Sequence, residues 1–467
     1  MSEPDDLAAL GQQLGFNREA RRVSVYVSSL TGLDTGIEYA RAFSEQGVDA
    51  VLCLDPGIND AATAVADDSG VPWVKLAGLS RREERCVRAH RNLVNIGTSF
   101  VAGANSAYRE IGPLGGPRTS LKRFTMRLIR CLPGRPTART WNRWGPNLFG
   151  RLLRSRFPTE WVLAVSVAAT PLFLCNRRLT VDTIVDSWDH PSRKVAGYPT
   201  RTVIAWNEPL AQDWLRFQGA QRWTVAPPRK LTYALEDRSL PEVNRSVATP
   251  RLLYPVATSP NVPDVFADEL ELLRDMGHAC RIAGWQLLVK PRPDAVPEML
   301  VDTVDSLEGA VLGRRLKQAG RALDYRLTAE YNTARLEELA TADLVVSTVT
   351  TFGLDAACAG RPILQMDLRQ MADLPALAAI SNNHHLRTHL YNLPSVITPK
   401  DRGDLVQAVI DALDAGATDP RSKHNSDALR DWVSGEQRSA SDVVRELNRM
   451  QGTHADDYRR ERRSRSA

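Results

Sequence analysis

Cysteine pairs at metal-binding spacing are missing from this chain of 467 residues. Its six cysteines lie far apart with no C-x-x-C pair, which excludes a clustered zinc site and a disulfide framework and favours a reducing compartment. Long hydrophobic runs are missing as well, because the most apolar stretch, residues 161–175, is interrupted by Ser166, Thr170 and Pro171. The acidic start, MSEPDDLAAL, lacks the basic and then apolar pattern of a signal peptide. These features predict a cytoplasmic protein.

Three catalytic signatures are also missing. The sequence contains no G-x-x-x-x-G-K-[ST] loop, no G-x-S-x-G elbow and no H-E-x-x-H pair, which disfavours P-loop ATPases, α/β-hydrolases and zincins. Glycine and proline, at 29 and 28 residues, are at ordinary levels, so collagen-like and wholly disordered chains are excluded too. With 43% apolar residues, a chain of this length predicts an enzyme-sized protein of two or three domains.

Acidic residues are absent from one long segment. Residues 111–159 contain eleven Lys or Arg and no Asp or Glu, although the net charge of the whole chain is +5. A basic segment that also carries bulky apolar side chains is typical of a surface that contacts an anionic membrane. A solvated insertion is an equally good interpretation, and nucleic acid is disfavoured because no recognised binding motif is present. The interleaved apolar residues are Phe124, Met126, Leu128, Ile129, Leu132, Trp141, Trp144, Leu148, Phe149, Leu152 and Leu153.

Apolar, β-branched runs alternate with helical patterns along the rest of the chain. This alternation is typical of parallel strands joined by crossover helices, so we predict an α/β fold of two Rossmann-like domains facing a cleft. The predicted strands are residues 23–27, 50–54, 71–76, 161–167, 183–185, 202–206, 221–225, 251–254, 286–290, 344–347 and 362–366. The predicted helices are residues 35–46, 209–218, 265–282, 336–341, 352–359, 405–415 and 441–451.

The predicted domain boundaries follow from changes in composition. Residues 1–228 form an N-terminal domain that contains the basic aromatic insertion at 111–159. Residues 229–250 are rich in Pro, Ser and charge and are the linker. Residues 251–452 form a second domain with closing helices, and residues 453–467 are a disordered basic tail.

One segment carries the sharpest local signal. Residues 343–367, DLVVSTVTTFGLDAACAGRPILQMD, predict a strand, a Ser/Thr-rich turn, a short helix and a second strand. Hydroxyl groups and free backbone N–H groups at such a turn can hold an anion such as a diphosphate. A carboxylate one turn into the helix, Asp355, would accept hydrogen bonds from vicinal hydroxyls such as those of a ribose, or would simply stabilise the first helical turn. The turn residues are Ser347, Thr348, Thr350 and Thr351.

Three segments together resemble a known enzyme family. The turn segment resembles the donor-nucleotide motif of two-domain, GT-B-type glycosyltransferases. Residues 186–190, DSWDH, and 203–208, VIAWNE, resemble a pattern of bacterial surface-carbohydrate and CDP-glycerol glycerophosphotransferase-like proteins. Residues 287–293, LLVKPRP, are similar to a K-P-H-P segment of the same proteins, with Arg292 at the position where relatives often have His. The resemblance spans roughly residues 157–415.

The resemblance implies a nucleotide-sugar donor, bound as substrate by the second domain, with Lys290 and Arg292 facing its phosphates. The reaction also needs a base that deprotonates the acceptor hydroxyl, and the candidates are Asp34 and Asp189, with Glu208 behind them. Asp34 follows the first strand, where ligands of α/β proteins gather, but it is equally suited to cap the next helix. Asp189 is likewise suited to cap the turn before Pro191.

We therefore predict a glycosyltransferase that needs no cofactor and no metal. Three histidines, His384, His385 and His389, match no known zinc site. The predicted acceptor is a surface polysaccharide or a lipid-linked precursor for the cell envelope, at the inner face of the plasma membrane, with segment 111–159 contacting the membrane. Alternatives are a CDP-glycerol-type glycerophosphotransferase, a nucleotide-sugar 2-epimerase and a non-catalytic polysaccharide-assembly protein. Trp188 and Trp206 are predicted to be core residues.

Overall fold

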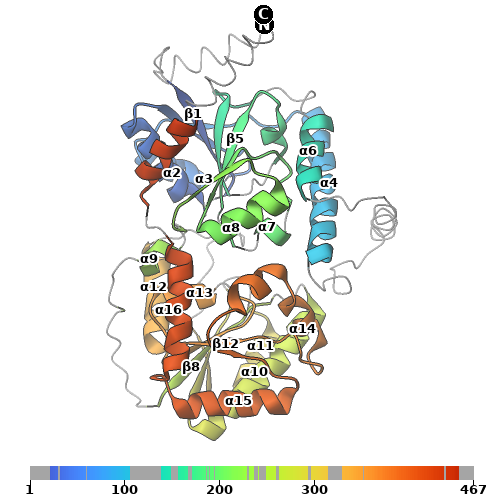
Figure 1. The fold of residues 1–467 in the computed structure, drawn as a ribbon, viewed down its shortest axis with the longest axis vertical. Helices are drawn as coiled ribbons and strands as arrows, with labels where there is room; N and C mark the ends of the chain where they lie inside the picture. The colour runs from blue at the N-terminus through green and yellow to red at the C-terminus, as the bar shows by residue number, and fades with distance from the viewer. Residues whose placement is uncertain are drawn as a thin grey trace, which may run out of the picture. The chain divides into compact units, whose positions relative to one another are not determined.

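A computed structural model provides the three-dimensional structure, and the chain separates into two compact units (Figure 1). Unit 1 comprises residues within 1–98, 134–228 and 435–467, and unit 2 comprises residues within 99–133 and 229–434. The residues that the structure describes are 21–29, 32–58, 60–105, 138–148, 156–166, 171–185, 187–188, 190–193, 195–228, 231–235, 240, 249–258, 262–292, 296–313, 329–350, 352–435 and 438–451.

Unit 1 is built on a parallel sheet of seven strands in the order β3-β2-β1-β4-β5-β6-β7. The inner strands are buried on both faces, which explains why their sequences are mostly apolar along their whole length. The strands are β1 (Arg22–Val27), β2 (Asp49–Leu54), β3 (Trp73–Lys75), β4 (Trp161–Val165), β5 (Thr180–Ile184), β6 (Thr202–Ala205) and β7 (Arg222–Val225).

Helices flank this sheet and complete the core of unit 1. Helix α2 begins at Leu33 directly after Gly32, and its apolar face packs on the sheet through Ile37, Ala40 and Phe43. A 3-10 turn (Pro171–Cys175) and a π-helical turn (Trp214–Gln218) complete the regular structure of this unit. The helices are α2 (Leu33–Glu45), α3 (Asp60–Asp68), α4 (Arg81–Asn105, of which the part up to residue 98 belongs to this unit), α6 (Ala138–Leu148), α7 (His190–Arg193) and α8 (Glu208–Asp213).

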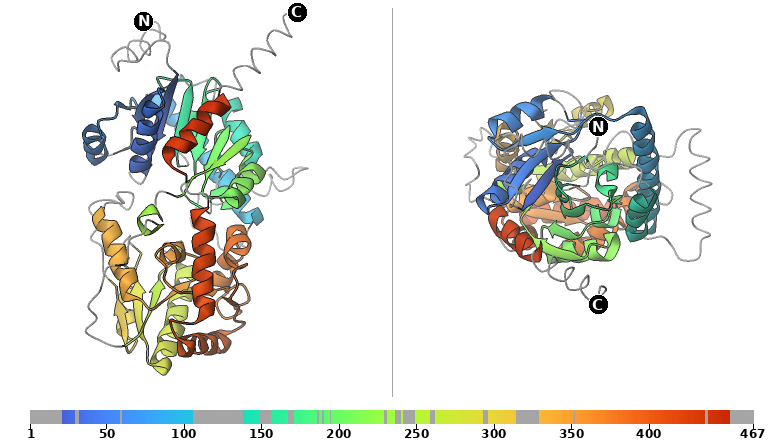
Figure 2. Two further views of the ribbon diagram at one scale, coloured as in Figure 1. Left: turned by 60° about the vertical axis from the view of Figure 1, so that its left-hand side comes forward. Right: turned by 90° about the horizontal axis from the view of Figure 1, so that it is seen from above.

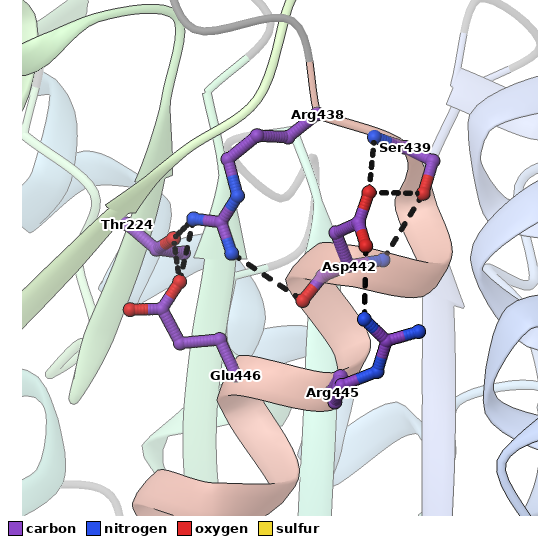
Figure 3. A network of polar contacts seen from close by, with 6 residues as sticks. All are labelled: Thr224, Arg438, Ser439, Asp442, Arg445 and Glu446. Carbon is purple, nitrogen blue, oxygen red and sulfur yellow. Dashed lines mark hydrogen bonds and ion pairs between the residues drawn. The ribbon is translucent and has the colours of Figure 1, made fainter.

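The last described helix, residues 440–451, also belongs to unit 1. Val443, Val444 and Leu447 are fully buried in the core formed with β1, β2 and β4. A polar network fastens the start of this helix to β7 (Figure 3): Arg438 donates to the Thr224 hydroxyl at 2.7 Å and pairs with Glu446 at 2.5 Å. The sequence-based prediction grouped this helix with the second domain. The structure differs because the chain returns to unit 1 after residue 434, a non-local event that local patterns do not encode.

Unit 2 is built on a parallel sheet of six strands in the order β10-β9-β8-β11-β12-β13. The first strand of the unit, β8, lies in the middle, and the chain builds outward first on one side and then on the other. This strand order is that of the Rossmann fold, and the first six strands of unit 1 follow the same order. The strands are β8 (Arg251–Pro255), β9 (Gln286–Lys290), β10 (Ala310–Leu312), β11 (Leu344–Ser347), β12 (Ile363–Met366) and β13 (Val396–Ile397).

Long helix α10 dominates the core of unit 2, burying Phe266, Leu270, Leu273 and Met276 against the sheet. It begins with Pro263 and ends at Gly284, whose left-handed backbone (φ 71°) suits glycine at a helix C-terminus. A π-helical turn (Leu386–Leu390) follows α14. The helices are α9 (Thr232–Leu235), α10 (Pro263–Ala283), α11 (Glu298–Asp305), α12 (Ala329–Thr341), α13 (Phe352–Cys358), α14 (Pro375–Ser381), α15 (Arg402–Ala415) and α16 (Pro420–Ser434).

The predicted α/β class with two Rossmann-like units is confirmed by the two sheets. The change of unit after Pro228 coincides with the predicted end of the first domain. The prediction lacked strands β10 and β13 and helices α3, α4, α6, α7, α9, α11, α14 and α16. That the two units face a common cleft stays a prediction, and most of the proposed linker and the tail 453–467 lie outside the described residues.

Candidate functional site

The carboxyl ends of β8, β9 and β11 meet at one edge of the unit 2 sheet. Between β8 and β11 the direction in which strands are added reverses, and in open α/β sheets ligands bind beside such a switch point. Two predicted donor-binding segments reach this edge: Lys290 and Arg292 lie at the end of β9, beside the turn after β8, and Ser347 ends β11. The fold therefore gathers residues that are far apart in the sequence.

A buried carboxylate fixes the turn after β8. Glu269 of α10, only 2% exposed, accepts hydrogen bonds from Ala257 N (2.6 Å), Thr258 N (2.8 Å), the Thr258 hydroxyl and the Tyr254 hydroxyl (3.2 Å). Burial raises the pKa of Glu269, and the four donors partly offset this effect. Burial and the neighbouring Glu269 also raise the pKa of Tyr254. The backbone at this edge is thus held by a satisfied polar network rather than by apolar packing alone.

Two cationic side chains, Lys290 and Arg292, lie at the carboxyl end of β9, and their environments differ. Arg292 is exposed, and its guanidinium donates to the carbonyl oxygen of Ala257 at 2.9 Å, so it bridges the ends of β9 and β8. Lys290 is 9% exposed and pairs with Glu338 of α12. Burial lowers the pKa of Lys290, although Glu338 opposes the shift by favouring the charged ammonium.

Asp355 is also engaged by α12. Its carboxylate, 2% exposed, pairs with Arg335 at 2.5 Å. The ring of Phe352 lies beside both cations, with Lys290 Nζ 5.2 Å and Arg335 Cζ 5.6 Å from its centroid. Two cations and two carboxylates from three elements thus form one buried cluster of zero formal charge, called here the α12 ion cluster (Lys290, Arg335, Glu338, Asp355).

The turn between β11 and α13 is tightly packed. Ser347 and Thr348 are buried, and the half-buried Thr350 accepts a hydrogen bond from Phe352 N at 3.2 Å. A Cβ atom at Gly353 would lie 2.3 Å from Ser347 Oγ, so only glycine lets the helix approach the strand this closely. Thr351 lies outside the described residues.

The predicted catalytic residues belong to unit 1. Asp34 is exposed in the first turn of α2; Gly32 occupies the cap position, so Asp34 is not the cap that the alternative interpretation required. Asp34 stands near the switch point of this sheet, between β1 and β4. There Ser166, directly after β4, has a left-handed backbone (φ 73°), a conformation that is strained for a non-glycine residue.

Asp189 lies outside the described residues, but the backbone that follows it is firmly held. Gln218 donates to Pro191 O at 2.8 Å and accepts from Ala196 N, while Asn142 accepts from Gly197 N at 2.8 Å. Trp188 and Trp206 are each 1% exposed, which confirms that they are core residues. Glu208 is exposed at the start of α8.

The three histidines do not converge. His385 and His389 are buried, and the His389 ring packs on Trp432 at 5.0 Å, whereas His384 interacts with Thr388 at 3.4 Å. Within the described ranges, no group of three His, Cys, Asp or Glu side chains is arranged to hold a metal ion. The same part of the chain contains no helix that is both long and apolar enough to cross a membrane.

Helix α6 is the best-described part of the basic segment. Trp141, one of the apolar residues assigned above to an interfacial surface, is 2% exposed and lies against Gly97 of α4; Figures 1 and 2 show these helices side by side. Trp141 is therefore a core residue of unit 1. Arg139 and Arg143 are exposed, as is Leu148 at 58%. Residues 111–137 and 149–155 lie outside the described residues.

Arg335, Glu338 and Glu269 were not predicted from the sequence. Glu269 gave a signal, because it occupies an apolar-face position of α10 between Phe266 and Leu270. Arg335 and Glu338 gave none, since an i, i+3 pair of opposite charges is usual on a solvated helix.

No protein-family profile and no curated protein matches this sequence. Solved structures similar to this chain include a glycosyltransferase from Rickettsia africae ESF-5, with 10% identity, coverage of 92% of this chain and 98% of that chain, and a TM-score of 0.45. MurG of Acinetobacter baumannii gives 9% identity, 92% and 99% coverage and a TM-score of 0.42. Anabaena Alr3699/HepE, solved with UDP and glucose, gives 9% identity, 93% and 100% coverage and a TM-score of 0.43. At such values the fold assignment rests on the strand order of the two sheets.

Proposed function

We propose that this protein is a glycosyltransferase whose unit 2 binds a nucleotide-sugar donor at the carboxyl edge of β8, β9 and β11. The supporting observation is the gathering of Lys290, Arg292, Ser347 and Thr348 at the switch point of a Rossmann-like sheet. These residues come from two sequence segments. Residues 343–367 resemble the donor-nucleotide motif of GT-B-type glycosyltransferases, and residues 287–293 resemble a K-P-H-P segment of CDP-glycerol glycerophosphotransferase-like proteins.

The chemistry of the edge suits a leaving group that is a nucleoside diphosphate. Transfer of the sugar places negative charge on the phosphate, which cations and hydroxyl donors stabilise without a metal. Arg292 is exposed and presents a planar set of donors that fits two phosphate oxygens. Thr350 and Thr351 would add hydroxyl contacts, and Asp355 a contact to the ribose once it is released from Arg335.

Unit 1 would supply the acceptor site and the base. Asp34 is our first candidate for the base because it is exposed at the end of β1, and Asp189 is the second. The acceptor we propose is a surface polysaccharide or a lipid-linked precursor at the inner face of the plasma membrane. Segment 111–159 would attract anionic lipid, so binding of the protein to anionic vesicles should weaken as salt is raised.

The direct experiment is calorimetric titration of the full-length protein with UDP, GDP, CDP and dTDP, followed by the sugar conjugates of whichever nucleotide binds. Arg292→Ala should weaken binding of that nucleotide at least about tenfold, which is the loss of roughly 1.4 kcal/mol expected for one charged hydrogen-bonding contact. Arg281→Ala, at the exposed end of α10, is the matched control and should bind like the wild type. If none of the nucleotides or conjugates binds, the proposed function is wrong; CDP-glycerol in the same series tests the glycerophosphotransferase alternative.

A further inference from the structure

Helix α12 supplies a charged partner to each of two residues that the proposed function assigns to the donor. Glu338 pairs with Lys290, and Arg335, three residues earlier on the same helix, pairs with Asp355. The lysine ammonium therefore already faces an anion that belongs to the chain itself. The pair keeps about a tenth of its side-chain surface exposed, 11% for Lys290 and 10% for Glu338.

The carboxylate of Glu338 is poorly satisfied for a buried group. Its Oε2 faces Lys290, but no hydrogen-bond partner for its Oε1 exists among the residues that the structure describes, and this atom lies near Gly313. The hydroxyl of Ser347, 1% exposed, similarly finds no partner within the described part of the chain. A buried carboxylate with a single partner is costly, because one ion pair seldom compensates for the lost hydration of both charges.

We propose that Glu338 is an internal competitor of the donor's phosphates for the Lys290 ammonium. This inference rests on the proposed function. A phosphate group that approaches β9 exchanges with the carboxylate, and Glu338 then turns away from Lys290. A nucleotide is bound only if its phosphates outcompete Glu338, so the residue sets a threshold that favours diphosphates over ligands of lower charge.

An alternative role makes the opposite prediction. If the α12 ion cluster were a fixed structural tie, removing the Glu338 carboxylate would leave a buried, uncompensated Lys290, destabilise unit 2 and weaken ligand binding. Competition predicts tighter binding instead, because Lys290 loses its internal anion. The sign of the change in affinity therefore separates the two roles.

The test titrates the full-length protein and its Glu338→Gln variant with inorganic pyrophosphate and with the nucleoside diphosphates used above. We expect Glu338→Gln to lower the dissociation constant of pyrophosphate at least about fivefold, the lower end of usual coupling between sites. Glu337→Gln, the exposed neighbour on α12, is the matched control and should leave the constant unchanged. In a Lys290→Met background, Glu338→Gln should no longer change the affinity, since the two substitutions act on one contact.

Unchanged or weaker binding by a folded Glu338→Gln variant, while the wild type binds a nucleoside diphosphate, would overturn the competition and leave the proposed function standing. Urea unfolding establishes whether the variant is folded, and Glu338→Met replaces it if it is not. Unfolding of both variants would contradict a displaceable pair. Binding of pyrophosphate and nucleotides by neither the wild type nor the variants would overturn both the inference and the proposed function.

Discussion

Glu269→Gln tests what stabilises the turn after β8, at the proposed donor-binding edge of unit 2. The substitution keeps the shape of the side chain but turns one acceptor oxygen into a donor, so one of the N–H groups of Ala257 and Thr258 loses its partner in a site that is 2% exposed at Glu269. An unpaired buried N–H costs about 1–3 kcal/mol, and the remaining bonds lose the assistance of the negative charge. The neutral amide recovers part of this loss, because burial raises the pKa of Glu269 and the ionised carboxylate is itself costly.

The expected net effect is a loss of about 1–3 kcal/mol in the free energy of unfolding. It is measured by urea unfolding, where the midpoint should fall while the dependence on urea stays constant. Glu308→Gln, exposed in the turn before β10, is the control and should stay within about 0.5 kcal/mol of the wild type. Glu269→Gln should also weaken nucleotide binding, because Arg292 donates a hydrogen bond to the carbonyl oxygen of Ala257, whose position Glu269 holds. A variant as stable as the wild type would refute the view that this network holds the turn.

Three further predictions concern other parts of the chain. Gly353→Ala places a methyl group 2.3 Å from Ser347 Oγ and should destabilise unit 2 by about 1–3 kcal/mol in urea; an unchanged midpoint would mean that the turn relaxes freely. Burial lowers the pKa of His90 from 6.5 to about 4. The free energy of unfolding should therefore be highest above pH 6.5 and fall by about 3 kcal/mol as the pH drops to 4. His90→Gln should remove this dependence on pH. Leu447→Ala should cost about 2–5 kcal/mol by thermal unfolding, whereas Arg445→Ala should be neutral; equal effects would contradict the place of this helix in the unit 1 core.

The sequence predicted most of the two sheets because buried parallel strands are short, β-branched runs, as in residues 23–27 and 344–347. It missed β10, whose three residues are half-buried or exposed and follow a glycine turn. It missed α4 because charged residues dominate the first two turns, whereas the buried face depends on distant partners, as where His90 contacts Gly197 and Gly97 contacts Trp141. Strand continuity is a local property, whereas these contacts depend on distant segments.

The site was predictable in its positions but not in its pairing. Lys290 and Asp355 were selected from motifs, and the structure brings them into one cluster. That Glu338 and Arg335 engage them could not be inferred, because Glu338 lies 48 residues from Lys290 in the sequence and only the tertiary fold brings the two together. The membership of residues 440–451 in unit 1 was unpredictable for the same reason. An apolar helix face can pack on the core of either unit, and only the tertiary fold, in which the chain re-enters unit 1 after residue 434, determines which one.

We propose that the donor binds at the carboxyl edge of β8, β9 and β11. Hydrogen–deuterium exchange of the full-length protein, with and without the nucleoside diphosphate that binds most tightly, tests it most directly. We expect slower exchange in residues 255–258, 290–292 and 347–353, and no change in the exposed turn at Thr418 between α15 and α16. Protection confined to unit 1, or absent from all three segments at saturating nucleotide, would contradict it.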